Sequence, residues 1–502
     1  MNTLAETISR ISPRPLRAHR PEVDSFYHLS GCPLASKVCN GTACFAARHL
    51  HVERWETACA QSPRVYCLGK CYAAPAAVGD NTRPTIAIRS REGIVLRRLS
   101  EGGARTLSAY RRQGGYETLE TALMRPREEI IRAVEGSALR GRGGAGFWAG
   151  RKWRAVFDQS VAQKFVVANA DEGDPGAYMD RFLLEDNPHA LIEAMAIAGY
   201  AVGASKGWIY LRKEYPEAQM VLQRAITEAR AGGLLGERVL NSDFGFDIEL
   251  FIGQGSYVCG EETALLNSIE GKRPEVRARP PFPTEHGLFG QPTLVNNVET
   301  LVNIPWILSH GEEAYRALGF SKSRGTKVLS LNSLFHRPGL YEVEFGVTVR
   351  HIVEELGGGL RTGKLKGVIM GGPLAGIIPP HLLDTRFGFE ELHSIGASVG
   401  HGGVIAFDEH TSIVELMHHV FSFAAYESCG KCTPCRLGSR HVEHTLEEVV
   451  KNGATNYWDE KDCEQVISAL KLTSLCGLGT GLAEFAESAL RHYGKELELC
   501  LR

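Results

Sequence analysis

Lys164–Gly176 has the sequence KFVVANADEGDPG. Its first half is a short run of β-branched and apolar residues, which is typical of a buried strand. Asn169, Asp171, Glu172 and Asp174 follow that run directly. Polar side chains at the carboxyl end of a strand suit a crevice that binds ribityl or ribose hydroxyl groups. An acidic turn on the surface is the alternative interpretation of the same residues.

Helical and β-rich stretches alternate around this segment, from Leu119 to about Leu318. Lys164–Ala170 and Gly207–Leu211 are candidates for buried strands, and the patterns of Pro188–Gly203 and Pro216–Ala231 predict helices. Such alternation predicts an α/β layer with a parallel sheet.

The sequence changes character on both sides of this layer. Residues 326–405 are rich in glycine and β-forming runs, so we expect a compact mixed β domain there, with strands over Lys327–Leu331, Leu340–Phe345 and Gly367–Met370 and a helix over Arg350–Leu356. From Ser412 onward the pattern is helical again, as in Val442–Val450 and Cys463–Leu472.

The N-terminal part, from about residue 25 to 105, predicts a small α/β unit. Ala43–Ala60 has apolar residues at helical spacing, and Pro63 prevents the helix from continuing. Thr85–Leu99 has two β-rich runs around Glu-Gly and predicts a short hairpin. Gly103–Gly115 is rich in Arg and Gly, which indicates a linker.

Composition excludes several classes of protein. The 502 residues are 43% hydrophobic and 23% charged with a net charge of −2, so neither nucleic acid nor an anionic membrane is an expected partner. No uncharged apolar run is long enough to span a membrane. The first twenty residues lack a hydrophobic centre, which argues against secretion; they are also Arg-rich and nearly free of acidic residues, which leaves an organelle presequence as an alternative. We therefore expect a cytoplasmic protein whose 13 cysteines serve mainly as metal ligands.

Glu427–Arg436, ESCGKCTPCR, contains the strongest chemical signal. Cys429, Cys432 and Cys435 form a C-x2-C-x2-C triplet, and Cys476 follows about forty residues later. Such a triplet with one distant cysteine is suited to the corners of a [4Fe–4S] cluster. Zinc sites usually have two separated pairs of cysteines instead, and zinc and buried thiols are the two alternatives.

A second set of cysteines lies near the N-terminus. Cys39 and Cys44 form a C-x4-C pair, and Cys67 and Cys71 form a C-x3-C pair. Two pairs of this kind are suited to a [2Fe–2S] cluster, with one pair on each iron. Zinc and a vestigial site are the alternatives.

Glycine loops supply the remaining signals. Leu139–Trp153, LRGRGGAGFWAGRKW, formally matches G-x-G-x-x-G at Gly141, Gly143 and Gly146. A dinucleotide-binding fingerprint follows a strand, whereas a helix-like stretch precedes this loop, so the match does not indicate a dinucleotide-binding fold. The glycines still allow the loop backbone to approach a phosphate or a flat ring closely, and Lys152 is placed to bind an anion. Further carboxylate, amide, cationic and aromatic groups lie in Gly253–Glu262 (GQGSYVCGEE), Arg277–Gly287 (RARPPFPTEHG) and Asn296–Thr300 (NNVET).

Together these motifs resemble the NADH-oxidising flavoprotein subunit of respiratory complex I, the 51 kDa type, whose module also occurs in soluble NAD-linked hydrogenases and formate dehydrogenases. The resemblance runs from about Tyr116 to Tyr493 and rests on RGRGGAGF, NADEGDPG, CGEETALLNSIEG, NNVET and ESCGKCTPCR in family order. The N-terminal part resembles a truncated form of the thioredoxin-like [2Fe–2S] subunit, the 24 kDa type. The implied α/β chain has four parts: residues 1–105 thioredoxin-like, 106–325 binding FMN and NAD, 326–405 a ubiquitin-like β-grasp (SLBB-like) domain, and 406–502 a helical [4Fe–4S] domain.

The resemblance also implies the site residues. FMN is expected at Gly141, Gly143, Lys152, Asn169, Asp171, Tyr257, Gly260, Glu261, Asn296, Asn297 and Thr300. NADH is expected at Phe147, Asp174, Glu262, Arg279 and Phe282, with Glu262 positioning the nicotinamide. Cys429, Cys432, Cys435 and Cys476 would hold the [4Fe–4S] cluster, and Cys39, Cys44, Cys67 and Cys71 a [2Fe–2S] cluster. Cys32, Cys59, Cys259, Cys463 and Cys500 have no assigned role.

Three positions depart from the family pattern: Asp174 where complex I usually has Glu, Trp148-Ala149 in place of Pro-Thr, and Arg279 where Lys is common. The departure at Arg279 bears on nicotinamide affinity, because Arg and Lys are not interchangeable at a contact.

The implied function is that of a diaphorase subunit. Hydride would pass between NADH and FMN, and single electrons would pass through the [4Fe–4S] cluster to other iron–sulfur and catalytic subunits of a soluble or membrane-associated redox complex. Asp174 would favour NAD by repelling a 2′-phosphate. The alternative is a non-catalytic assembly or electron-relay subunit that keeps the fold and the cluster but no flavin.

Overall fold

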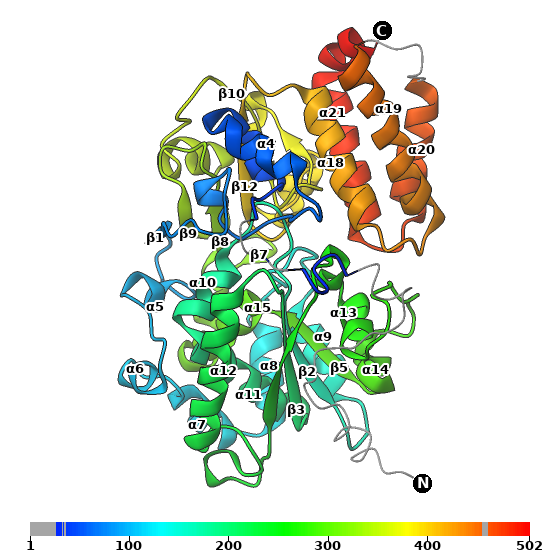
Figure 1. Cartoon of the computed structure of the whole chain (residues 1–502). Helices are drawn as coiled ribbons and strands as arrows, with labels where there is room; N and C mark the ends of the chain where they lie inside the picture. Colours follow the sequence, from blue (N-terminus) through cyan, green and yellow to red (C-terminus); the bar gives the residue numbers. More distant parts are fainter. Residues whose placement is uncertain (1–26, 33, 35–36, 454–459, 502) are drawn as a thin grey trace.

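The computed structural model describes residues 27–32, 34, 37–453 and 460–501, and the side chains of all of these except 460–461 and 499–501. A four-stranded sheet with its helices forms one half of the molecule, and a six-stranded sheet and a helical bundle lie side by side in the other half (Figure 1). The first twenty residues, on which the presequence alternative rests, lie outside the described residues.

The four-stranded sheet is parallel and has the order β4-β3-β2-β5. Its strands are β2 (Phe165–Ala170), β3 (Lys206–Leu211), β4 (Asp247–Ile252) and β5 (Thr293–Asn297). The apolar residues of β2 are fully buried, because helices cover both faces of a parallel sheet. The two strands predicted in this region are confirmed, and all four carboxyl ends meet at one edge of the sheet.

The helices of this half include both predicted ones, α11 (Pro188–Val202) and α12 (Pro216–Ala231). Proline at the first helical position suits both, because it offers no N–H where none is needed. The others are α7 (Glu117–Leu123), α8 (Arg127–Gly136), α9 (Ala149–Phe157), α10 (Met179–Asp186), η3 (Val239–Asn241), η4 (Tyr257–Gly260), α13 (Glu262–Ile269), α14 (Pro283–His286), η5 (Leu288–Gly290), α15 (Val298–His310) and α16 (Glu312–Arg316).

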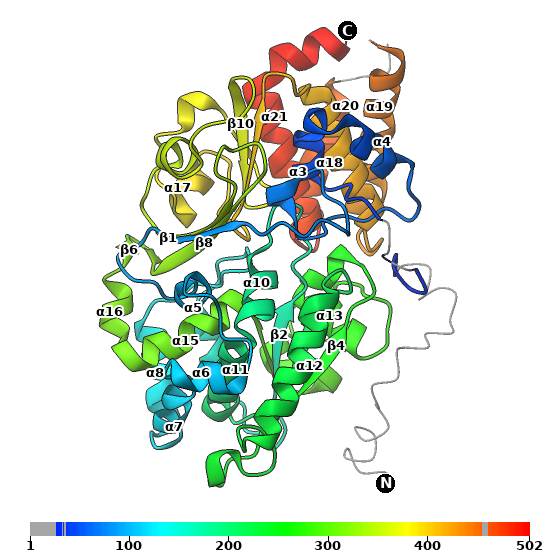
Figure 2. The same ribbon diagram turned by 60° about the vertical axis from the view of Figure 1, so that its left-hand side comes forward.

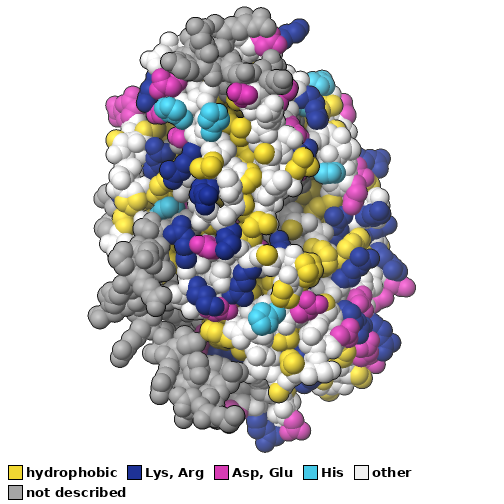
Figure 3. All heavy atoms as spheres, turned by 90° about the vertical axis from the view of Figure 1, so that its right-hand side faces the viewer, with side chains coloured by type: hydrophobic (Ala, Val, Ile, Leu, Met, Phe, Trp, Pro, Cys, Tyr) yellow, Lys and Arg dark blue, Asp and Glu magenta, His cyan; other side chains and the backbone are white. Residues whose placement is uncertain are grey.

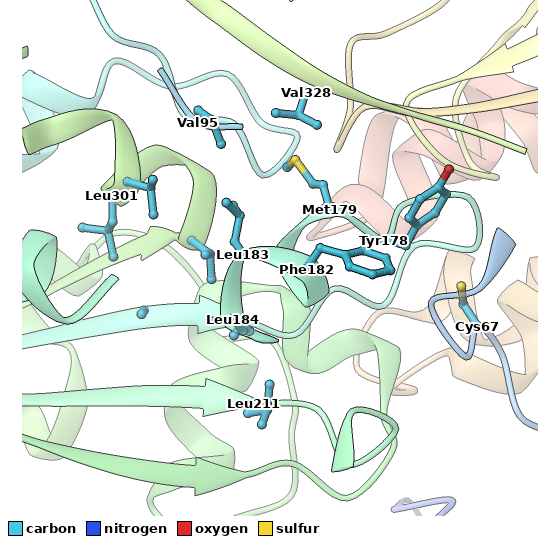
Figure 4. Packing of buried hydrophobic residues seen from close by; sticks show 14 of the residues in the cluster. Cys67, Val95, Tyr178, Met179, Phe182, Leu183, Leu184, Leu211, Leu301 and Val328 are labelled. Carbon is cyan, nitrogen blue, oxygen red and sulfur yellow. The ribbon is translucent and has the colours of Figure 1, made fainter. Parts of the chain in front are cut away.

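Helix α10 lies where the two halves of the molecule meet. Its residues Met179, Phe182 and Leu183 belong to one buried cluster that also contains Leu301 of the flanking helix α15 and Val328 of the other sheet (Figure 4). The main hydrophobic core therefore continues across the boundary between the two halves, which holds the segments that precede and follow α10 in fixed positions.

The six-stranded sheet is mixed and has the order β1-β9-β8-β12-β10-β11. Its strands are β1 (Thr85–Ile88), β8 (Thr326–Leu331), β9 (Gly339–Glu344), β10 (Leu365–Met370), β11 (Ile377–Ile378) and β12 (Gly403–Asp408), and a small ribbon of β6 (Gly319–Phe320) and β7 (Ser323–Arg324) precedes it. The three strands predicted here are confirmed. The helix predicted over Arg350–Leu356 is present as a π-helix, η6 (His351–Leu356). The 3-10 helix η7 (Pro380–Leu382) and the helix α17 (Phe389–Ser394) complete the region. The expected boundary between residues 405 and 406 falls inside β12.

The N-terminal part corrects two predictions. Thr85–Leu99 is not a hairpin: β1 pairs in parallel with β9, and the chain continues into α5 (Arg97–Ser100). Gly103–Gly115 is not a plain linker, because it contains the helix α6 (Leu107–Arg112), whose N-terminus Thr106 caps.

The predicted helix over Ala43–Ala60 is interrupted, with α3 (Thr42–Ala46), η1 (Arg48–Leu50) and α4 (Val52–Ala60) in its place, and η2 (Cys71–Ala73) follows. Helix α3 packs against β12 and against α18 of the bundle (Figure 2). Among the described residues of this part, the one strand, β1, belongs to the six-stranded sheet.

The C-terminal region is helical, as predicted. It consists of α18 (Ile413–Glu427), η8 (Pro434–Gly438), α19 (Ser439–Asn452), α20 (Glu460–Thr473) and α21 (Gly477–Leu501). Ser412 caps α18 by accepting a hydrogen bond from the N–H of Glu415. Within the described part of the chain, no helix combines the length and the apolar character that a membrane span requires.

Candidate active site

A cleft of about 380 Å³ opens at the carboxyl edge of the parallel sheet. Eight of the predicted flavin and nicotinamide residues line it: Gly143, Asn169, Asp171, Asp174, Tyr257, Gly260, Glu261 and Asn297. The other half of the molecule supplies the opposite wall, with Gly371, Leu374, Ala375, Ser398, Gly400 and His401 from the six-stranded sheet and Cys476, Gly477, Leu478, Thr480, Gly481 and Glu484 from the bundle. The cleft therefore forms only where the three regions meet.

The glycine loop between α8 and α9 forms one end of the cleft. A bridge between Arg140 and Trp148 closes the loop, and the N–H of Gly141 donates to the carbonyl of Phe147 at 2.7 Å. Gly144 and Gly146 have positive φ values of 126° and 61°, which glycine adopts without strain. The loop is thus a fixed turn that presents backbone to the cleft.

Asn297 packs against this loop. A side chain at position 143 would place its Cβ 2.9 Å from the Cβ of Asn297, so only glycine fits there. Asn297 accepts a hydrogen bond from the N–H of Thr300 through Oδ1 and donates to Asp180 through Nδ2, at 2.7 Å. Both ends of the amide are therefore fixed by hydrogen bonds.

The acidic loop after β2 forms the floor of the cleft. Asn169 donates to the carbonyl of Gly260 at 2.8 Å, and the hydroxyl of Tyr257 donates to Asp174 at 2.7 Å. One carboxylate oxygen of Asp171 is buried without a hydrogen-bond partner among the described residues. Burial raises the pKa of Asp171 well above its usual range, and burial also raises the pKa of Asp174.

Glu261 and Glu262 begin helix α13 and have different partners. Glu261 caps the helix by accepting from the N–H groups of Thr263 and Ala264, while its other carboxylate oxygen is buried and has no hydrogen-bond partner within the described structure. Glu262 is paired with Lys152 at 2.7 Å and with Arg279 at 3.2 Å. Burial opposes ionisation of Glu262, but these two cations outweigh it and lower its pKa.

Several predicted residues lie behind the lining of the cleft. Thr300 accepts a hydrogen bond from the N–H of Arg142 at 2.8 Å, and Asn296 accepts one from the indole of Trp153 at 2.9 Å. Both side chains are buried, so in this structure they position the glycine loop and α9. Lys152 has Glu262 and the carbonyl of Val295 as partners. Phe147 and Phe282, by contrast, are 53% and 49% exposed.

Cys429, Cys432, Cys435 and Cys476 come together between α18, η8 and α21. All four are described, and no three of their sulfur atoms lie within 4.8 Å of one another. Thiolates around one zinc ion, with Zn–S bonds of about 2.3 Å, would lie roughly 3.8 Å apart. In this structure the four sulfurs are therefore less tightly gathered than the ligands of a single zinc ion would be. Burial raises the pKa of Cys435 to about 12 and of Cys476 to about 11, so holding them as thiolates requires nearby positive charge.

This cysteine site borders the cleft directly. Cys476 is part of the cleft wall, and Val258, which also lines the cleft, packs in one buried cluster with Cys429, Ala264 and Val276. Cys476 therefore borders the cleft itself, and Val258 lies between the cleft and Cys429.

Cys39, Cys44, Cys67 and Cys71 are all buried and form a chain of contacts. Cys39 is hydrogen-bonded to Cys44 and to Cys67, and the sulfur atoms of Cys67 and Cys71 lie 3.3 Å apart. The N–H groups of Gly41 and Gly69 donate to the sulfurs of Cys39 and Cys67 at 3.4 Å each. This group of cysteines packs against the acidic loop after β2, where Gly41 approaches Pro175.

The sequence did not point to the wall contributed by the six-stranded sheet. Gly144 forms a β-bridge with Gly400, which brings His401 to the cleft. The only signal there was Val399–Gly403, VGHGG, and glycine pairs are too common to indicate a site alone. Among the cysteines without a role, Cys259 and Cys463 are buried, Cys59 is exposed, and the side chain of Cys500 lies outside the described residues.

The fold and the cleft define a class of protein: one with a polar ligand cleft at the carboxyl edge of a parallel sheet and a four-cysteine site beside it. Residues 134–306 match the Nuo51 FMN-binding domain, and residues 415–500 match the NADH-ubiquinone oxidoreductase-F iron-sulfur binding region. Asp171 and Glu261 each have a carboxylate oxygen without a hydrogen-bond partner among the described residues, which fits FMN, because FMN offers hydroxyl and N–H donors.

Individual proteins agree with these matches. The chain is 43% identical over 385 residues to the NADP-reducing hydrogenase subunit HndC of Solidesulfovibrio fructosivorans, covering 76% of this chain and 78% of that one. It is 40% identical over 407 residues to the F 2 subunit of the NADH-quinone oxidoreductase of Rhizobium meliloti, covering 81% and 96%. A solved structure of an NAD⁺-reducing [NiFe]-hydrogenase superposes with a TM-score of 0.80 at 29% identity, over 99% of this chain and 89% of that one.

The chain belongs to the 51 kDa family of flavoproteins, which includes the F-type subunits of NADH-quinone oxidoreductases. It is an NADH-binding oxidoreductase subunit with FMN and a [4Fe–4S] cluster as cofactors, of the complex I or hydrogenase type, and its partners are other subunits of such a complex.

Proposed function

We propose that this chain accepts hydride from NADH and delivers single electrons to a partner subunit of an NAD-linked hydrogenase, a formate dehydrogenase or an NADH dehydrogenase. One observation carries the proposal: a single cleft is lined both by the polar residues expected for FMN and by Cys476 of the iron–sulfur site. Bound FMN supplies the exchange between two-electron hydride chemistry and one-electron transfer.

Within this proposal, the chain's own residues bind and orient rather than transfer protons. Asp171 and Glu261 each have a buried carboxylate oxygen without a hydrogen-bond partner among the described residues, and the Glu261 oxygen lies 3.9 Å from the guanidinium of Arg279. Tyr257 holds Asp174 in place through its hydroxyl. Val258 and Leu374 cover the cleft from the apolar side and help to exclude water.

The nicotinamide nucleotide is proposed to enter at the exposed end of the cleft. Phe147 and Phe282 are exposed aromatic rings on which a base can stack, and Arg279 is fixed by Glu262. Asp174 would repel a 2′-phosphate and so favour NAD over NADP. One relative carries the name of an NADP-reducing hydrogenase, so this preference needs a direct test.

We also propose that Cys39, Cys44, Cys67 and Cys71 hold a [2Fe–2S] cluster. The four thiols form a chain rather than a compact tetrahedron, since no three of their sulfurs, all described, lie within 4.8 Å of one another. This suits a pair of cysteines on each of two irons. Backbone N–H groups directed at two of the sulfurs support the assignment.

A serine substitution tests this second cluster. Cys67→Ser should lower the iron content of the anaerobically purified chain by about two atoms. Cys259→Ser is the matched control, because Cys259 is equally buried but belongs to neither set. Equal iron in the Cys67 variant and the wild type would refute the assignment.

A partner is proposed to dock beside the [4Fe–4S] site. Leu437, Leu472 and Leu475 are exposed around the cysteine-bearing loops, and Leu472 is 77% exposed. Figure 3 shows the face that carries α14 and α20, where hydrophobic side chains gather among Lys and Arg side chains. We further propose that the chain divides into four parts, residues 1–105, 106–325, 326–408 and 409–502, with the third boundary at the end of β12. We also propose a cytoplasmic location, because thiol ligands stay reduced there.

Diaphorase activity separates this function from that of a non-catalytic assembly subunit. The purified chain should contain FMN and reduce ferricyanide with NADH. A chain isolated anaerobically with intact iron but with neither FMN nor this activity would favour the assembly role.

A further inference from the structure

The charges that line the cleft are unbalanced. Asp171, Asp174, Glu261 and Glu484 contribute carboxyl groups, and of the described lining residues only His401 is basic. FMN brings a phosphate that carries close to two negative charges at neutral pH. A ligand of this charge requires a cation or a set of N–H donors in such a cleft.

Four cations belong to the glycine loop, and none of them lines the cleft. Arg140 is paired with Glu390 at 2.6 Å, and Arg151 lies over the ring of Trp148. Lys152 is paired with Glu262 and donates to the carbonyl of Val295. Arg142 is fully buried, and its guanidinium donates to the carbonyls of Arg140 and Arg324 and to the hydroxyl of Tyr315.

His401 is placed to act as a cation. Its side chain is 8% exposed, and its Nε2 lies 3.1 Å from the Asp180 carboxylate and 3.2 Å from the Nδ2 of Asn297. Its other ring nitrogen, Nδ1, has no hydrogen-bond partner in the described part of the chain. Burial alone would lower the pKa of His401, but Asp180 and Glu172 outweigh burial and the opposing Lys327, and they raise it to about 9. The raised pKa favours the imidazolium at neutral pH. In that form Nε2–H donates to Asp180, and the Nδ2 of Asn297, itself a donor to Asp180, is a neighbour of the ring rather than its hydrogen-bond partner.

His401 and the two carboxyl groups beside it, Glu172 and Asp180, do not form a metal site. Glu172, Asp180 and His401 have ligand atoms within 4.8 Å of one another. The Glu172 carboxylate, however, accepts from the N–H groups of Asp180 and Arg181 and from the hydroxyl of Tyr215. Its oxygens are thus already used, and the group is a hydrogen-bonded network that fixes the imidazole ring.

We propose that His401 binds the phosphate of FMN, together with Asn297 and the backbone N–H groups of the glycine loop. These elements lie at one end of the cleft: Asn297 contacts both Gly143 and His401, and Gly144 is bridged to Gly400. The part of the cleft lined by Val258, Leu478 and Cys476 is more apolar and is left for the ring. The six-stranded sheet thereby supplies a side chain to the flavin site.

Flavin affinity tests this assignment, which rests on the cleft being the FMN site. The full chain is deflavinated, and the Kd values of FMN and of riboflavin, which lacks the phosphate, are measured by quenching of flavin fluorescence. His401→Gln should weaken FMN binding about tenfold or more, as expected for the loss of a charged hydrogen bond, and should change riboflavin binding less than about twofold. His401→Lys should retain most of the preference for FMN.

His189→Gln is the matched control, because His189 is a buried histidine with a carboxylate partner, Glu228, and does not line the cleft. It should leave both Kd values unchanged. Equal weakening of FMN and riboflavin by His401→Gln, or no weakening of either, would overturn the phosphate assignment and leave the flavin site intact. Failure of the wild-type chain to bind either flavin would overturn the flavin site itself.

Discussion

The backbone N–H of Tyr257 donates a hydrogen bond of 2.9 Å to the carboxylate of Glu427. Tyr257 lines the flavin cleft, and Glu427 is the last residue of α18, two residues before Cys429. The loop that forms one wall of the cleft and the loop that begins the iron–sulfur site are thus joined by a partly buried hydrogen bond. This contact ties the position of Tyr257 at the cleft to the end of α18.

Removing the acceptor at Glu427 should loosen this connection. Glu427→Ala leaves a buried N–H unpaired, so we expect a loss of about 1–3 kcal/mol in the free energy of unfolding and a lower rate of NADH–ferricyanide reduction. Glu427→Gln keeps an acceptor oxygen and should retain most of both. Chemical denaturation measures the stability, and equal losses for the two variants would show that the charge rather than the hydrogen bond matters.

Two glycines of the same loop should respond differently to alanine. Gly143→Ala brings a Cβ to 2.9 Å from the Cβ of Asn297 and should lower FMN affinity by roughly tenfold or more, because Asn297 must move. At Gly141 the nearest atom would be 3.6 Å away, an ordinary contact, so Gly141→Ala should have a smaller effect. Flavin titration of the two variants compares them, and a larger effect at position 141 would contradict this geometry.

Asp174 should set the preference for NAD. Asp174→Asn removes the carboxylate while keeping the size of the side chain, so the ratio of kcat/KM for NADPH over NADH should rise, roughly fivefold to tenfold, as repulsion of the 2′-phosphate is lost. Tyr257→Phe, which removes the hydrogen bond but not the charge, serves as the control. An unchanged ratio in Asp174→Asn would show that Asp174 does not select the nucleotide.

The preference for FMN over riboflavin should depend on pH. Because the pKa of His401 is raised to about 9, the imidazolium is present at neutral pH and is lost as the pH rises through that value. The ratio of riboflavin Kd to FMN Kd should therefore be steady from pH 7 to 8.5 and fall above pH 9, since the phosphate, with a pKa near 6, is a dianion throughout. In His401→Gln the ratio should be flat.

The free energy of unfolding should also depend on the protonation of His401. The unfolded chain has a histidine pKa of about 6.5, so the pairing of His401 with Asp180 contributes fully below that value and is lost as the pH rises through about 9. Denaturation of the wild type and His401→Gln across this range measures the contribution.

The strands of the parallel sheet could be predicted because each is a continuous apolar run, buried on both faces, as in Phe165–Ala170. The partner of Thr85–Ile88 could not, because a short β-rich run looks the same whether it pairs with its neighbour or with β9, far along the chain. Local pattern carries no information about such distant pairing.

In the site, too, residues placed by local sequence could be predicted and residues placed by distant contacts could not. The position of Asn169, Asp171 and Asp174 at the cleft could be predicted, because they lie at the end of β2 and directly after it. The position of His401 could not, because it depends on the bridge between Gly144 and Gly400 and on the distant Asp180. Thr300 and Asn296 have the expected residue types, but their oxygens accept hydrogen bonds from Arg142 and Trp153, a geometry that no motif specifies.

Anaerobic EPR of the purified chain before and after addition of NADH, with iron and flavin quantified in the same sample, tests the central claim most directly. We predict one FMN per chain, about six irons if both cysteine sites are filled or about four if only the C-terminal one is, and a reduced-cluster signal that appears when NADH is added. A chain with intact clusters that binds FMN but gives no reduced-cluster signal with NADH would contradict the proposed electron transfer.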